Sequence, residues 1–364
     1  MVIRNNLERL KAYKPGKPIE ELKRELGLDK IYKLASNESP FYPSHIKKAI
    51  ISELSSVNRY PQGDCFYLRK LLASKLKVKR EQLVFGNGSD DIIIMAIRAF
   101  TGTSSNIVVA SPTFLIYELQ ARASGVNVKR VPFNNYRYNL KAMAKSIDKK
   151  TAIVFIANPD NPHGTYIHHN ELVHFLSLIP GDILVFLDEA YYEFAPRRDF
   201  PQSIKLLKER GNIIITRTFS KAYALAGLRI GYAITTSLIS ETLNKVREPF
   251  NVNRFAQAAA IAAVKDNKFI RKCVSYINKE KKFLYRIFTR LDVEYVESAT
   301  NFILVNFKSD TRELCRYLLK RGVIIRDLSS WGLNGFFRVT VGLHKENAAF
   351  VDNFKSYLKI QRHG

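Results

Sequence analysis

Residues 212–222 set the architecture of this chain: they read Asn212-Ile213-Ile214-Ile215-Thr216-Arg217-Thr218-Phe219-Ser220-Lys221-Ala222. The first half is a run of β-branched residues, which is typical of a parallel strand buried on both faces. The strand ends near Phe219, so Ser220 and Lys221 fall at its carboxyl end. Open α/β sheets bind their ligands at that edge. The segment therefore predicts a sheet covered by helices, with a lysine where a ligand would lie.

Lys221 adds chemistry to this position. An ammonium group in a partly desolvated pocket can lose its proton, and the free amine can then bond to an aldehyde. Ser220 and the nearby Arg229 supply a hydroxyl and a guanidinium, which suit an anion. An aldehyde and a phosphate occur together in pyridoxal phosphate, so these residues predict that cofactor. The alternative is a solvated surface lysine, because Lys and Arg number 58 here and most lysines are exposed.

Length and composition indicate a globular protein with two lobes. The chain has 364 residues, 46% of them hydrophobic, which is enough for a sizeable core. It contains no apolar run of the roughly 18 residues that a membrane span needs, and its first residues lack the apolar segment of a signal peptide. We therefore expect a cytoplasmic protein without membrane partners. Three isolated cysteines, Cys65, Cys273 and Cys315, argue against a disulfide framework and a paired-cysteine zinc site.

The formal net charge of +25 is the most unusual bulk property. Such a charge suits nucleic acid, an anionic membrane or anionic substrates. The basic residues are scattered, however, with only short clusters at residues 75–80, 145–150 and 279–282. No repeat, low-complexity arm or aromatic-basic motif accompanies them. A solvated surface is the favoured interpretation, and a basic nucleic-acid-binding protein is the alternative from another class.

The chain alternates predicted strands and helices from residue 107 onward, which indicates an α/β fold with a mostly parallel central sheet. Strands are expected at 107–110, 126–131, 151–157, 183–187, 213–218 and 230–234, and earlier helices at 4–13, 19–26, 44–54, 67–76 and 92–100. The pattern of predicted strands and helices changes after residue 250, where shorter mixed segments indicate a smaller α+β lobe. We expect an N-terminal arm over 1–33, a large cofactor-binding domain over 34–250 and a small domain over 251–364, with the site between lobes.

Three further segments place polar residues at strand ends. Gly86-Asn87-Gly88-Ser89-Asp90 opens a helix and exposes free backbone amides to an anion. Asp91 stands where a dinucleotide fingerprint needs its third glycine, so nicotinamide binding is disfavoured. Asn161 follows one strand, and Asp188 and Tyr191 end another. Each could be an ordinary turn or capping residue, but all these strand ends meet at one edge of the sheet.

With these blocks assembled, the chain resembles the class II, fold-type-I pyridoxal-phosphate aminotransferases, whose fold is like that of aspartate aminotransferase. Within that family its motifs are most similar to those of the histidinol-phosphate aminotransferases. The resemblance runs from Asn37 to Gly342 and rests on Asn37-Glu38-Ser39-Pro40, Arg59-Tyr60-Pro61, Gly86-Asn87-Gly88-Ser89-Asp90, Asn161-Pro162-His163-Gly164, Asp188-Glu189-Ala190-Tyr191, Arg217-Thr218-Phe219-Ser220-Lys221-Ala222 and Leu225-Ala226-Gly227-Leu228-Arg229.

The resemblance implies a role for each matched residue. Lys221 would bond to the cofactor and move protons, and Asp188 would pair with its ring nitrogen. Tyr191 and Asn161 would contact the ring oxygen, and Phe114 would cover the ring face. The cofactor phosphate would be held by Gly88, Ser89, Asp90, Ser220, Arg229 and, from the neighbouring subunit of a homodimer, Tyr60.

Three other residues are assigned to substrate by the same resemblance. Arg338 would bind the carboxylate of glutamate or 2-oxoglutarate, Arg326 the phosphate of histidinol phosphate, and Asn37 would lie beside them. The implied reaction belongs to histidine biosynthesis: histidinol phosphate and 2-oxoglutarate give imidazole-acetol phosphate and glutamate. His163 stands where threonine is usual, which leaves threonine-phosphate decarboxylase and aromatic aminotransferase as alternatives. A metal site at His168, His169 and His174 is disfavoured, because neighbouring helical residues point apart.

Overall fold

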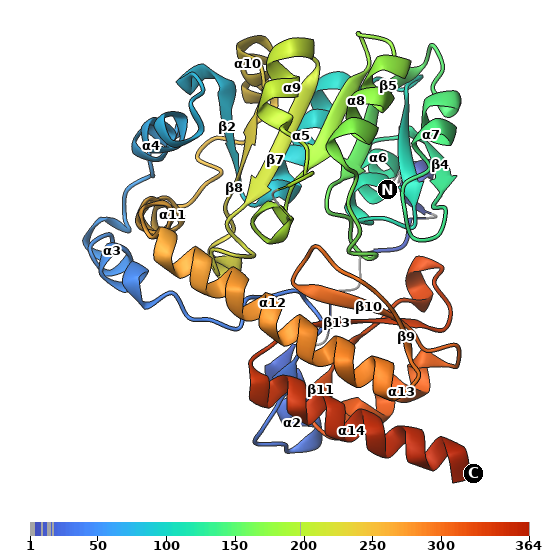
Figure 1. Ribbon diagram of the computed structural model, residues 1–364. Coiled ribbons are helices and arrows are strands. Elements are labelled where there is room, and N and C mark those ends of the chain that lie inside the picture. The colour runs from blue at the N-terminus through green and yellow to red at the C-terminus, as the bar shows by residue number, and fades with distance from the viewer. Residues whose placement is uncertain (1–3, 9, 13–15, 17, 197, 364) are drawn as a thin grey trace.

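The structure is a computed structural model that describes residues 4–8, 10–12, 16, 18–196 and 198–363. It has a larger lobe built on a seven-stranded sheet and a smaller lobe built on a four-stranded sheet (Figure 1). Helix α12 (Asn267–Arg290) starts beside the larger lobe and runs across the smaller one. The seven-stranded sheet has the strand order β2-β8-β7-β6-β5-β3-β4.

The large sheet is mostly parallel, as predicted. Strands β7, β6, β5, β3 and β4 are parallel neighbours, whereas β8 is antiparallel to both β7 and β2. The strands are β2 (Leu83–Gly86), β3 (Asn106–Ser111), β4 (Asn127–Pro132), β5 (Thr151–Ala157), β6 (Leu184–Asp188), β7 (Ile213–Thr218) and β8 (Gly231–Ile234). The bounds of β5 and β7 are those expected from sequence. The sequence did not predict β2, because its four residues are all buried and lack a period-two pattern.

Helices cover both faces of this sheet, because successive side chains of a strand point to opposite sides. In β7, Ile213 and Ile215 join one hydrophobic core, while Ile214 joins the other. The second core contains α5 (Ser89–Phe100), α6 (Ile116–Ala123) and α10 (Ser237–Val246). The first contains α4 (Phe66–Leu76), α7 (Leu140–Ser146), α8 (His169–Leu178), α9 (Ser203–Arg210) and α11 (Arg254–Lys265). The β-branched run at 213–215 is thus buried on both faces.

The smaller lobe is an antiparallel sheet with helices packed against it. Its strand order is β12-β13-β10-β9, and its hydrophobic core is shared with the helices. The elements are β9 (Glu294–Val296), β10 (Phe302–Asn306), β12 (Arg326–Asp327) and β13 (Phe336–Thr340), with α12, α13 (Thr311–Leu319) and α14 (His344–His363). A short parallel pair, β1 (Tyr32–Lys33) with β11 (Val323–Ile324), joins the N-terminal segment to this lobe. The domain limits at 33/34 and 250/251 stay a prediction.

Two expected helices differ from the structure in length or continuity, and α5 begins three residues earlier than expected, at Ser89. The helix expected over 4–13 was wrong in length: α1 spans Asn5–Glu8 and residues 10–12 are not helical, whereas residues 9 and 13 lie outside the described residues. The helix over 44–54 is interrupted, with α3 (Lys47–Ile51) lying between 3-10 turns at Ser44–Ile46 and Leu54–Ser56. The remaining N-terminal helix, α2, has the expected bounds, Ile19–Leu26. Short helices of this kind gain little from propensity, so tertiary contacts set where they end.

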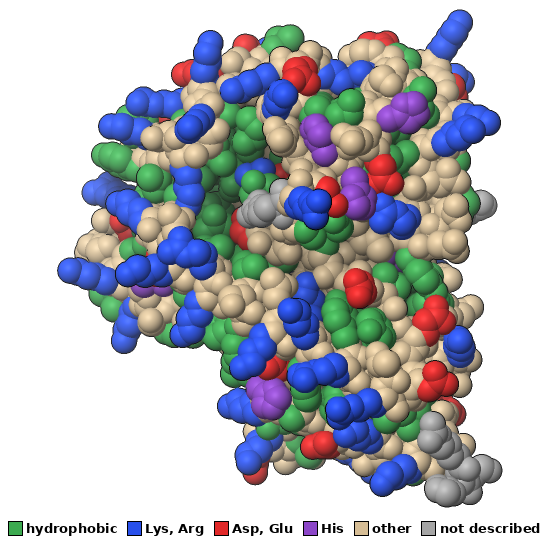
Figure 2. All heavy atoms as spheres, in the orientation of Figure 1, with side chains coloured by type: hydrophobic (Ala, Val, Ile, Leu, Met, Phe, Trp, Pro, Cys, Tyr) green, Lys and Arg blue, Asp and Glu red, His purple; other side chains and the backbone are tan. Residues whose placement is uncertain are grey.

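On the face of the molecule that Figure 2 shows, the basic residues do not form one patch. Figure 2 shows lysine and arginine side chains spread over both lobes of the visible face. None of the helices in the described part of the chain combines the length and the apolar composition that a bilayer crossing requires.

The core of the larger lobe can be tested within a single helix. Phe175 of α8 is fully buried, whereas Val173 two residues earlier is 41% exposed. Phe175→Ala should lower the free energy of unfolding by about 3–5 kcal/mol, because it leaves a cavity that the packed sheet cannot fill. Val173→Ala should change it by less than about 0.5 kcal/mol. Urea unfolding followed by circular dichroism measures both, and equal effects would contradict the assignment of this face to the core.

Candidate active site

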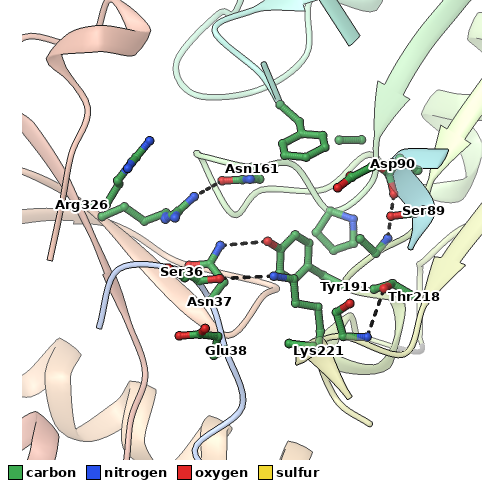
Figure 3. Close-up of a pocket in the computed structure, with 18 of the residues that line it drawn as sticks. Ser36, Asn37, Glu38, Ser89, Asp90, Asn161, Tyr191, Thr218, Lys221 and Arg326 are labelled. Carbon is green, nitrogen blue, oxygen red and sulfur yellow. Dashed lines mark hydrogen bonds between the residues drawn. The ribbon is translucent and has the colours of Figure 1, made fainter. Parts of the chain in front are cut away.

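A cavity of about 310 Å³ lies where three parallel strands end. Ala157, Asp188 and Thr218, the last residues of β5, β6 and β7, all line it. The segment before α3 contributes Ala35 to Glu38, and the smaller lobe contributes Arg326 and Arg338. Figure 3 shows side chains from both lobes pointing into this space. The cavity therefore lies at the edge of the sheet where the sequence predicted a ligand site.

Lys221 extends into the cavity from the turn after β7. Its Nζ donates a hydrogen bond of 3.4 Å to the carbonyl of Ser36 and lies 5.7 Å from the ring centre of Tyr191. Burial lowers the pKa of Lys221 to about 8, and the positive charge of Arg338 adds to this effect. The amine can therefore lose its proton under mildly alkaline conditions and act as a nucleophile or base.

Asp188 is a buried carboxylate with defined partners. Its Oδ2 accepts a hydrogen bond of 2.7 Å from the Tyr117 hydroxyl. Its Oδ1 accepts from the backbone N–H of Ala190 at 3.1 Å and from the hydroxyl of Thr216 at 3.3 Å. Burial raises the pKa of Asp188 to about 6, and the Tyr117 hydrogen bond opposes that rise. A cation placed against Asp188 would stabilise its charged form.

An anion-binding cradle lies at the start of α5. Gly88 has a φ of +83°, and a Cβ on it would lie 2.5 Å from Nη2 of Arg229, so a side chain there would strain the backbone and displace the guanidinium. Arg229 donates to Ser220 Oγ at 3.3 Å and to Asp90 Oδ2 at 3.4 Å. The first backbone N–H groups of α5, including that of Ser89, have no acceptor within the helix and form its positive end. These groups together suit a phosphate.

Asn37, Tyr191, Asn161 and Arg338 link the lobes across the cavity. Asn37 Nδ2 donates to the Tyr191 hydroxyl at 2.9 Å, and Arg338 Nη1 donates to Asn161 Oδ1 (Figure 3). Arg338 Nη2 also donates to the carbonyl of Ala35 at 2.8 Å. Burial raises the pKa of Tyr191 to about 12, so its hydroxyl keeps its proton. The Arg338 guanidinium is thus held in one orientation.

The cavity brings together most of the residues that the sequence singled out. Those lining it are Asn37, Ser89, Asp90, Phe114, Asn161, Asp188, Tyr191, Ser220, Lys221, Arg229, Arg326 and Arg338. Gly88 borders it through Arg229. Tyr60 lies outside it: its side chain is 79% exposed and stacks on Phe250 with ring centres 4.7 Å apart.

Sequence reasoning missed several residues of the cavity. They are Ser36, Tyr117, Thr218 and Trp331. Tyr117 lies in the first turn of α6, only three residues after Phe114, and this closeness in sequence is a signal that could have pointed to it. Trp331, the only tryptophan of the chain, comes from a 3-10 turn at Ser329–Trp331 in the other lobe. No local pattern connects that turn to the large sheet.

Comparison with known proteins defines the class. The family model for aminotransferase class I and II matches residues 29–353, and the chain belongs to this family. It is 42% identical over 360 residues to the histidinol-phosphate aminotransferase of Geobacillus sp. (strain WCH70), covering 99% of each chain. It is 44% identical over 351 residues to the enzyme of that name from Moorella thermoacetica, covering 96% of this chain and 91% of the relative.

A solved structure supports the same class. The histidinol-phosphate aminotransferase of Sinorhizobium meliloti, in complex with pyridoxal 5'-phosphate, superposes with a TM-score of 0.89 at 28% identity and covers 98% of both chains. The fold-type-I resemblance stated from sequence is therefore confirmed.

The low pKa of Lys221 can be measured directly. In cofactor-free protein, acylation of Lys221 quantified by peptide mass spectrometry should reach half its maximal rate near pH 8, whereas exposed lysines as a class need a pH near about 10.4. Arg338→Met should raise the midpoint for Lys221, because it removes a neighbouring positive charge. A midpoint for Lys221 equal to that of the exposed lysines would refute the burial argument.

Proposed function

We propose that this chain is a pyridoxal-phosphate-dependent histidinol-phosphate aminotransferase. It exchanges the amino group of histidinol phosphate with 2-oxoglutarate, giving imidazole-acetol phosphate and glutamate, a step of histidine biosynthesis. The observation that carries the proposal is the convergence of an amine, a buried carboxylate and an anion cradle in one cavity: Lys221, Asp188 and the Gly88–Arg229 pair. Full-length relatives of that name supply the choice of substrate.

The cavity fits the cofactor on its own geometry. The amine of Lys221 matches the aldehyde, the carboxylate of Asp188 matches the ring nitrogen, and the cradle around Arg229 matches the phosphate. Gly88 is the sharpest of these matches, since any side chain there would occupy the space beside the guanidinium. When bound, the cofactor supplies a ring that accepts electrons from the carbon bearing the amino group. Phe114 lines the same cavity and would cover one ring face.

Each residue of the cavity would have a separate role in the reaction. Lys221 Nζ, with its pKa near 8, would take the proton from the substrate carbon that bears the amino group and pass it to the cofactor carbon that bears the aldehyde. Asp188 would pair with the positive charge of the ring nitrogen, and Tyr117 holds Asp188 in place through its hydrogen bond. Tyr191, which stays protonated, would donate to the ring oxygen together with Asn161. Enclosure of the site between the two lobes would limit the access of water to the substrate carbon that loses its proton.

Two arginines of the smaller lobe would select the substrates. Arg338 is 5% exposed and its fork is already oriented by Ala35 and Asn161, which suits a planar carboxylate. Arg326 lies directly opposite Arg338 on the neighbouring strand β12, and it also borders a second, larger cavity of about 1160 Å³. This position suits the phosphate of a longer substrate. Asn37 is fixed between Tyr191 and Thr340 and completes the wall.

A substrate panel on the purified protein tests the proposal. Histidinol phosphate with 2-oxoglutarate should yield glutamate, and Lys221→Ala should lower this rate by more than about a thousandfold because it removes the base. Lys205→Ala, at an exposed lysine of α9, is the control and should keep the native rate. Threonine phosphate should release no carbon dioxide, and aromatic amino acids should react more slowly. Carbon dioxide release, or a native rate in Lys221→Ala, would overturn the proposal.

We also propose that the enzyme is a homodimer in which Tyr60 completes the neighbour's site. Tyr60 belongs to a group of large exposed side chains in one part of the chain: Tyr42, Ile51, Leu54, Val57, Tyr60, Phe66 and Tyr67. An apolar surface of this kind marks a protein interface. Since Tyr60 does not line the cavity of its own chain, its hydroxyl is available to the cradle of a second copy.

Mixing two variants with different defects tests this arrangement. Tyr60→Ala should weaken cofactor binding, and Lys221→Ala should abolish turnover. If Tyr60 acts in the partner, dissociating and recombining equal amounts should restore tight-binding, active sites in about a quarter of all subunits, because half of the dimers are mixed. The separately handled variants are the control. Absence of any recovery in verified mixed dimers would place Tyr60 outside the neighbour's site.

A further inference from the structure

A buried carboxylate lies behind the wall of the cavity. Asp160, in the turn that follows β5, has an exposure of 0% and does not itself line the cavity. Burying an ionised carboxylate is costly unless donors surround it. The proposed roles of the cavity residues give this carboxylate no function, yet the chain maintains it in a fully enclosed place.

Asp160 accepts hydrogen bonds from four donors. The Thr113 hydroxyl lies 2.5 Å from its Oδ1 and the Tyr138 hydroxyl 3.1 Å from the same atom. Its Oδ2 accepts from the backbone N–H of His163 at 3.2 Å and lies 2.8 Å from Nδ1 of the same residue. An ionised carboxylate can only accept, so Nδ1 of His163 carries the proton. Each oxygen of the Asp160 carboxylate therefore has two hydrogen-bond partners.

The ring of His163 also packs against an aromatic side chain. Its ring is 1% exposed and lies 4.0 Å, centre to centre, from the ring of Phe133. The residue combines a donor for Asp160 with a flat surface that fills the core next to Phe133. A threonine at this place could donate a hydrogen bond but would leave that aromatic contact unmade. The histidine at position 163, where threonine is usual, thus forms a buried pair with Asp160.

Two of the segments that supply donors, those of Thr113 and His163, also carry a residue of the cavity wall. Thr113 immediately precedes Phe114, and Asp160 immediately precedes Asn161. The Tyr138 hydroxyl also accepts from the backbone N–H of Ala157 at 2.9 Å, the last residue of β5. One carboxylate therefore ties together the connection after β3, the turn after β5 and the end of β5 itself.

The same turn contacts the smaller lobe. Asn161 Oδ1 accepts from Arg338 Nη1. Gly164 N–H donates to the Asp160 carbonyl at 2.9 Å, and the Gly164 carbonyl accepts from Ala299 N–H at 2.8 Å. A Cβ on Gly164 would lie 2.5 Å from Ser298 Oγ, so the approach of the two lobes is close here. A change at Asp160 would reach Arg338 through Asn161.

We propose that Asp160, paired with His163, is a positioning residue that sets the places of Phe114 and Asn161 and, through Asn161, of Arg338. The proposal rests on the cofactor and substrate roles given above. Asp160 then controls how tightly the site holds pyridoxal phosphate and how well it binds a substrate carboxylate, although it touches neither molecule. Its loss should raise the cofactor dissociation constant and the KM for glutamate more than it lowers kcat.

Asp160→Asn tests this because it keeps the shape and removes the charge. The matched control is Glu280→Gln: Glu280 is also a buried carboxylate, 3% exposed, bonded to His344 and Asn347 in the smaller lobe. Titration of cofactor-free protein with pyridoxal phosphate, followed by absorbance, should show at least about tenfold weaker binding for Asp160→Asn, the loss expected for one buried charged hydrogen bond. Glu280→Gln should stay within about twofold of wild type at a similar loss of thermal stability.

A double-mutant cycle separates positioning from general stability. If Asp160 acts through Asn161, adding Asp160→Asn to Asn161→Ala should weaken cofactor binding by less than half of its separate effect on a logarithmic scale, whereas independent structural damage would add in full. Should Asp160→Asn fail to fold, Thr113→Val and Tyr138→Phe each remove one donor and should each weaken binding about threefold or more.

Three results would overturn the proposal. They are native cofactor affinity in Asp160→Asn, native affinity in both single-donor variants, and full additivity with Asn161→Ala. Failure of the wild-type chain to bind pyridoxal phosphate would instead overturn the proposed function and this inference with it. The two failures are therefore distinguishable in the same titration.

Discussion

The pairing of β5, β6 and β7 in parallel register is the constraint on which the site depends. Ala157 pairs with Asp188, and Asp188 pairs with Thr216, so the carboxyl ends of three strands reach the same edge of the sheet. Hydrophobic residues buried on both faces hold that register, because a slip of one residue would turn every side chain to the opposite core. For this reason Asp188 lies next to the turn that carries Lys221 and the turn that carries Asn161.

Burial then gives the adjacent groups their chemistry. Desolvation lowers the pKa of Lys221 to about 8 and raises that of Asp188 to about 6, so each group lies closer to neutrality than it would in water. The surrounding arginines, Arg229, Arg326 and Arg338, give the cavity a positive character that suits phosphorylated and carboxylated molecules. The overall charge of +25 is a separate matter, since the basic side chains are spread over the visible surface (Figure 2).

The smaller lobe takes part in the site through a few specific contacts. Arg338 reaches Asn161 and Ala35, and the Tyr191 hydroxyl is held by Asn37, whose own Oδ1 accepts from Thr340. Contacts of this kind join residues about 150 to 300 positions apart in the chain. The position of Arg338 relative to the large sheet therefore depends on how the two lobes meet. A change in the turn at 160–164 would affect both lobes.

The sequence alone determined the strands at 151–157 and 213–218, the mostly parallel sheet and the candidate residues within each motif block. Local periodicity and turn chemistry encode such features, because they depend on neighbours within a few residues. Tertiary structure alone decided that Tyr117 bonds to Asp188, that Trp331 enters the cavity and that Asp160 collects donors from three segments. It also shortened the helix at Asn5–Glu8 and added β2 to the sheet. These features depend on strand order and on packing between distant segments, which no local pattern in the chain records.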